Sequence, residues 1–82
     1  MRMLDMATQQ PLRNVIVYLT REEAIQVRSA LDQLLAITDD AVAEHIHIND
    51  SEYRHELTLT IYTKANIDKF DARSRQLLLE ES

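Results

Sequence analysis

The sequence predicts a small α+β domain, a two-layer β-α-β-β-α arrangement in which a three-stranded sheet carries two helices packed on one face. Three observations lead to this fold class. A run of β-branched residues precedes a segment of helical periodicity, two segments that alternate between apolar and polar residues follow it, and a second helical pattern ends the chain. At 82 residues the chain has the size of one domain and is too short for two separate cores.

The first strand is expected at residues 15–19, a run of the sequence VIVYL. Residues 1–11 before it lack periodicity, so they predict a flexible N-terminal arm ahead of a single compact domain over residues 12–82. The run is apolar on both faces, which is typical of a strand that is covered on both sides. Because the two helices cover one face only, a second copy of the chain is the simplest cover for the other, and we expect a homodimer.

The first helix is expected over residues 21–37. Thr20 and Glu23 have the spacing of a capping box, in which each side chain accepts a hydrogen bond from the backbone N–H of the other residue. The apolar residues that follow recur at the spacing of one helix face, and they are Ala24, Val27, Leu31, Leu34 and Leu35.

The second and third strands are expected to form an antiparallel hairpin. Over residues 44–48, His45 and His47 point one way and the two isoleucines between and after them point the other. Residues 49–51, Asn-Asp-Ser, have turn chemistry, and residues 55–62 alternate again. The last helix opens with Thr63 or Asn66 as a candidate cap, and its apolar stripe consists of Ile67, Phe70, Ser74, Leu77 and Leu78.

Composition excludes several classes of function. The chain has no cysteine, which excludes disulfides and thiolate metal sites, and no glycine, which excludes phosphate-cradling loops and nucleophile elbows. The net charge is −5 and the basic residues are dispersed, so nucleic acid is not expected as a partner. There is no secretory signal pattern and no apolar run long enough to span a membrane, so we expect a cytoplasmic protein with no membrane partner.

The concentrated chemistry lies between Glu44 and Glu56, where all three histidines stand among acidic residues. Two histidines two residues apart on a strand share a face, and both can reach one zinc ion. The candidate metal ligands are His45, His47, His55 and Glu56. However, His55 is in phase with the apolar row of its strand, whereas the other two histidines are out of phase with theirs. The simpler interpretation is that His45 and His47 are solvent-facing strand residues paired with Thr, Tyr or Glu neighbours and that His55 caps the edge of the core.

The function that we expect from the sequence is a small protein-interaction or regulatory domain that acts by contact and not by catalysis. Its acidic surface would suit a basic protein partner as well as a second copy of the chain. The competing hypothesis is a domain that binds a divalent metal, zinc in the first place, through the histidine strand.

Overall fold

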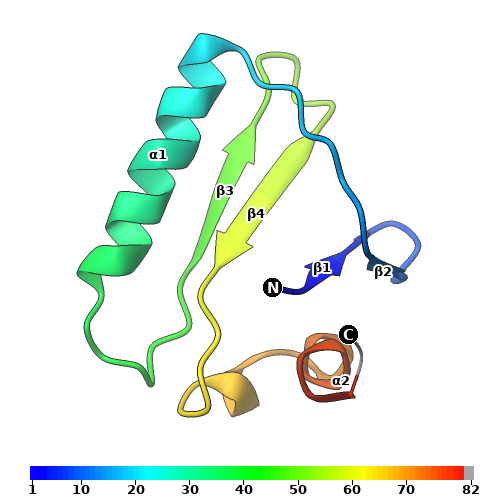
Figure 1. Ribbon diagram of the computed structural model, residues 1–82, viewed down its shortest axis with the longest axis vertical. Helices are drawn as coiled ribbons and strands as arrows, with labels where there is room; N and C mark the ends of the chain where they lie inside the picture. The colour runs from blue at the N-terminus through cyan, green and yellow to red at the C-terminus, as the bar shows by residue number, and fades with distance from the viewer. Residues whose placement is uncertain (81–82) are drawn as a thin grey trace.

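The computed structural model, which describes residues 1–80, is a small α+β domain with two helices and two separate two-stranded antiparallel sheets (Figure 1). In chain order the elements are β1 (Met3–Leu4), β2 (Pro11–Leu12), α1 (Arg21–Ala36), β3 (His45–Asn49), β4 (Glu56–Thr60), the single 3₁₀ turn η1 (Ile67–Lys69) and α2 (Ala72–Glu80). Residues 81–82, the end of the predicted domain, lie outside the described part of the chain.

The helix α1 begins where the capping box predicts. The Thr20 hydroxyl accepts a hydrogen bond from the Glu23 N–H at 3.2 Å, and the Glu23 carboxylate accepts one from the Thr20 N–H at 2.8 Å. These two bonds satisfy backbone donors that the helix itself leaves free. The helix then packs beside β3 and β4, with Ala30 and Leu34 buried at the contact (Figure 1).

The β3–β4 hairpin confirms the predicted antiparallel pairing. Ile46 lies opposite Leu59 and Ile48 opposite Leu57, so the apolar residues of both strands share one face. The polar residues, among them His47 opposite Thr58, share the other face. Since Ile48 is buried and α1 packs on the hairpin, the apolar row forms the core contact with α1.

The prediction of a three-stranded sheet is wrong. Residues 15–19 are not in a strand, and they link β2 to α1. Within residues 1–80 the sheets are the β3–β4 pair and a short pair at the N-terminus, in which Met3 lies opposite Leu12. That second pair belongs to a segment with no periodic pattern in the sequence, and the Gln9 carbonyl accepts a hydrogen bond from Nε of Arg73 at 3.0 Å.

The second helical pattern is divided into η1 and α2. The chain becomes extended at Phe70, and the Asp71 carboxylate then accepts a hydrogen bond from the Ser74 N–H at 2.7 Å, which is the geometry of a new helix cap. Neither predicted cap therefore opens α2. This second helix lies beside the β1–β2 hairpin and away from α1, so the predicted packing of both helices on one sheet face is also wrong (Figure 1).

Asn66, one of the two predicted caps, is instead the most deeply buried polar residue described, with 1% of its surface exposed. Its Nδ2 donates hydrogen bonds to the carbonyls of Val42 and Ile61, both at 2.9 Å, and its Oδ1 accepts one from the Thr63 N–H at 2.8 Å. One side chain thus joins the segment before β3, the segment after β4 and the turn that leads to η1.

Candidate interaction surface

The predicted metal ligands are divided among three separate contacts. Nδ1 of His47 lies 2.9 Å from Oε1 of Glu56 and 2.8 Å from Oγ1 of Thr58, on the polar face of the hairpin. His45, although two residues away on the same strand, contacts the ring of Phe70, with the ring centroids 5.4 Å apart. The structure therefore brings His47 and Glu56 together and directs His45 to the segment after β4.

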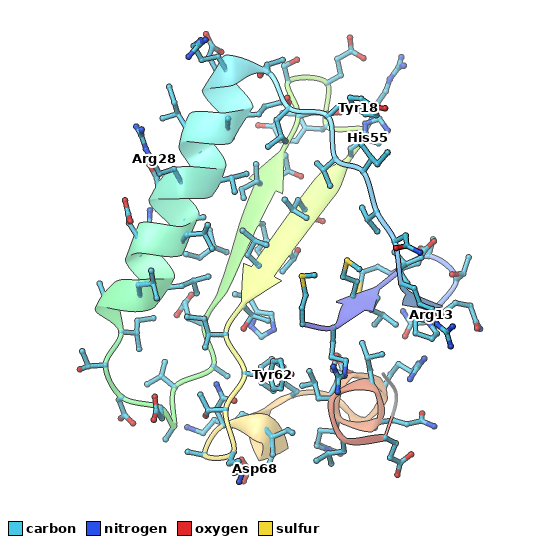
Figure 2. The ribbon with its side chains drawn as sticks, viewed as in Figure 1. Arg13, Tyr18, Arg28, His55, Tyr62 and Asp68 are labelled. Atoms are coloured by element: carbon cyan, nitrogen blue, oxygen red, sulfur yellow. The ribbon has the colours of Figure 1, made fainter. Side chains whose placement is uncertain are left out.

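His55 lies in the β3–β4 loop, where Nδ1 is 2.6 Å from Oδ2 of Asp50 (Figure 2). It precedes β4 and takes no part in the strand's alternation. Among residues 1–80, no group of three or more histidine and carboxylate side chains is placed to hold a metal ion. The set of His45, His47, His55 and Glu56 is thus not assembled, because each of the three histidines lies against a different neighbour.

Asp50 organises the loop that holds His55. Its carboxylate accepts hydrogen bonds from the Arg54 N–H at 2.8 Å and contacts the His55 ring. The hydrogen bond with the His55 side chain is the main cause that lowers the Asp50 pKa below its ordinary value. Tyr53 in the same loop has a φ of 56°, a left-handed conformation that costs about 1 kcal/mol for a residue other than glycine. The contacts of Asp50 with Arg54 and His55 therefore stabilise the turn between β3 and β4.

An open hollow of about 620 Å³ separates the start of α1 from the β3–β4 loop. The residues that line it have polar side chains, and they include Thr20, Glu22 and Gln26 from the helix side and Asn49 and Ser51 from the loop. Sites for small organic ligands are enclosed and mostly apolar. The hollow is open and no aliphatic residue lines it, so it is a poor match to such a ligand.

The largest departure from an ordinary protein surface is the linker between β2 and α1. We call residues 15–19, with the sequence VIVYL, the apolar linker. All five side chains are between 42% and 87% exposed. Exposure alternates along the linker. Ile16 and Tyr18 are 75% and 87% exposed, whereas Val15, Val17 and Leu19 are close to half exposed. This is the alternation of an extended strand with one face turned fully outward.

The backbone of the apolar linker is as open as its side chains. Within the described residues, no N–H or C=O group of residues 15–19 forms a backbone hydrogen bond, and no strand pairs with them. Natural proteins protect such edges with charged residues, proline or a covering element. The linker contains no charged residue and no proline, and Arg13 and Arg21 are the nearest charges on either side. Tyr18 projects from the linker near the start of α1 (Figure 2).

The total surface of the chain supports the same conclusion. A folded monomer of 9.6 kDa exposes about 5,100 Å², whereas this chain exposes 6642 Å². Five hydrophobic residues are buried, and sixteen large hydrophobic residues of the described part of the chain are exposed, five of them in the apolar linker. The chain thus exposes about 1,500 Å² more than a self-contained domain of its mass.

Sequence reasoning placed these residues in a strand with one face under the helices and the other under a second copy of the chain, so it did not predict that both faces are exposed. The signal was present, because a run that is apolar on both faces needs two covers and the chain offers few elements to supply them. None of the helices in residues 1–80 is long and apolar enough to cross a membrane. Comparisons of the chain with protein family models, with curated proteins and with solved structures find no match.

Proposed function

We propose that this chain is a cytoplasmic protein-interaction domain that acts by contact, and that the apolar linker is its binding surface. The observation that carries the proposal is the combination of five exposed apolar side chains with a backbone that pairs with no strand over the same residues and runs as an open trace from β2 to α1 (Figure 1). A partner strand laid along this backbone would gain main-chain hydrogen bonds, and apolar pockets for alternate side chains would give it specificity.

Charge supports a protein partner over other classes. The net charge of −5 opposes binding to a phosphate backbone or to an anionic membrane. The apolar linker itself is uncharged, so the binding energy comes from burial of apolar surface and from backbone pairing. The acidic residues outside it would affect the rate of association and the choice among partners.

The test compares two exposed tyrosines. Tyr18 in the apolar linker is 87% exposed and Tyr53 in the β3–β4 loop is 81% exposed, so both are equally open to solvent in the isolated chain. A photoreactive phenylalanine derivative is placed at each position in turn, the chain is irradiated in living cells, and the adducts are identified by mass spectrometry. We expect defined protein adducts at position 18 and only background at position 53. Equal labelling at the two positions would refute the proposal.

A further inference from the structure

The partner that best fits the apolar linker is a second copy of itself. Resting on the proposed function, we infer that two chains associate about a two-fold axis by pairing their apolar linkers as antiparallel strands, with Val17 on the axis. The isolated chain exposes about 1,500 Å² more than a monomer of its mass. The apolar linker supplies part of this excess and exposed apolar residues elsewhere supply the rest; an interface that buried the whole excess on both chains would remove about 3,000 Å², which lies in the range of obligate homodimer interfaces.

The register follows from symmetry. A two-fold axis perpendicular to a strand pair places equal faces of the two strands on the same side, so odd-numbered residues must lie opposite odd-numbered ones. With Val17 opposite its own copy, Val15 lies opposite Leu19 and Ile16 lies opposite Tyr18. This register uses all five residues of the apolar linker, and it makes two aromatic to β-branched pairs, which are favourable across strands.

Pairing with a partner's β4 is a poorer match. One face of β4 carries Glu56, Thr58 and Thr60, whereas both faces of the apolar linker are apolar. Such a pair would place apolar side chains against a polar row on one face. Self-pairing sets apolar residues opposite apolar residues on both faces, and it leaves Asn14 and Thr20 as the polar ends of the pair.

The chain has no cysteine, so single introduced cysteines report the register directly. In the variant Val17→Cys, the two Cα atoms would lie about 4.5 to 5.5 Å apart, which is within reach of a disulfide. In Ile16→Cys the two Cα atoms would be roughly 8 Å apart, which is beyond that reach. In the double variant Ile16→Cys, Tyr18→Cys, the cysteine at position 16 of one chain lies opposite the cysteine at position 18 of the other, which restores the short distance. Leu35→Cys, at an exposed position on α1, is the control for random collision.

The variants are oxidised with diamide and analysed on non-reducing gels, and the mass of the wild-type chain is measured by sedimentation over a dilution series. We expect a dimer, with Val17→Cys and the double variant forming covalent dimers about tenfold faster than Ile16→Cys or Leu35→Cys. The exposed substitution Tyr18→Asp should give a folded monomer by circular dichroism, since Tyr18 makes little contact with its own domain.

The outcomes separate this inference from the proposed function. A wild-type monomer at all concentrations, an open-ended polymer, or equal rates for all the cysteine variants would overturn self-pairing. If the chain is a monomer but the photoreactive group at position 18 still labels a different protein, the interaction domain stands and its partner is not a second copy. A monomer with no labelling at position 18 would overturn both.

Discussion

Replacement of Asn66 tests whether one buried amide holds together the segment before β3, the segment after β4 and the turn that leads to η1. Asn66 is 1% exposed, and Asn66→Ala removes its three part-buried hydrogen bonds to Val42, Ile61 and Thr63, which leaves two carbonyls and one N–H without that partner. Each buried group left without a partner costs about 1 to 3 kcal/mol. Since Val42 and Ile61 are 39% and 40% exposed, water can reach part of these groups, and the expected loss is about 1 to 3 kcal/mol of the roughly 4 to 12 kcal/mol that a domain of this size has in total.

The assay is urea denaturation followed by circular dichroism. We expect the midpoint to fall and the slope of the free energy of unfolding against urea to stay unchanged, because the surface exposed on unfolding is the same. The control is Asn49→Ala, an exposed asparagine on β3, with an expected change of about 0.5 kcal/mol or less. Equal effects of the two substitutions would refute the role assigned to Asn66.

Asn66→Asp adds a pH dependence with a definite sign. The substitution keeps an oxygen facing the Thr63 N–H but replaces the donor group with a carboxylate oxygen beside two carbonyls. Burial and the missing donor raise the pKa of the introduced carboxyl in the folded state above its value in the unfolded chain. The folded state then binds more protons, so the stability of this variant should improve as the pH falls from 7 toward the ordinary range of a carboxyl group. A loss of stability over the same range would contradict the assigned geometry.

Two further predictions concern the helices. Leu34→Ala should lower the free energy of unfolding by about 2 to 5 kcal/mol, whereas Leu35→Ala on the same helix should change it by about 0.5 kcal/mol or less. The reason is that Leu34 is 3% exposed and Leu35 is 70% exposed. If urea denaturation gave similar values for the two variants, α1 would have a different orientation on the hairpin. The hydrogen bond from the Ser74 N–H holds the pKa of Asp71 below its ordinary value of 3.8, so its contribution to stability is present above that value and is lost as the pH falls through the lowered pKa. Asp71→Asn keeps an acceptor for the cap and should remove this part of the acid sensitivity, as unfolding measured between pH 7 and about 2 would show.

The elements that the sequence predicted well are those governed by local chemistry. Thr20 and Glu23 define the start of α1 with hydrogen bonds between residues three apart, and no distant group is needed. The β3–β4 register follows from the alternation of apolar and polar residues on each side of a short turn, because a slip by one residue would expose Ile46 and Ile48. The apolar stripe over residues 67–78 predicted helical structure there, but it did not predict the break between η1 and α2, which depends on the new cap formed by Asp71.

The candidate site depended on contacts between distant residues, which a sequence pattern does not contain. The three histidines are close in sequence, but each contacts a different residue: His45 contacts Phe70, His55 contacts Asp50 and His47 contacts Glu56. The predicted zinc ligand set is therefore not assembled. The sequence predicted Asn66 as a candidate helix cap, whereas in the structure its buried amide donates hydrogen bonds to the carbonyls of Val42 and Ile61. Only the folded chain brings these carbonyls to the amide.

The sequence by itself determined that residues 15–19 are an uninterrupted apolar run, which predicts a strand and favours burial, because β-branched and aromatic residues suit strands and apolar surface favours removal from water. Only the tertiary structure decided that the chain leaves this requirement unmet. A strand is stable only when its backbone forms hydrogen bonds with a neighbouring strand, and which strand becomes its neighbour depends on contacts between residues far apart in the chain. In this fold α1 covers the β3–β4 hairpin, while the linker stays outside both sheets and its apolar side chains remain exposed.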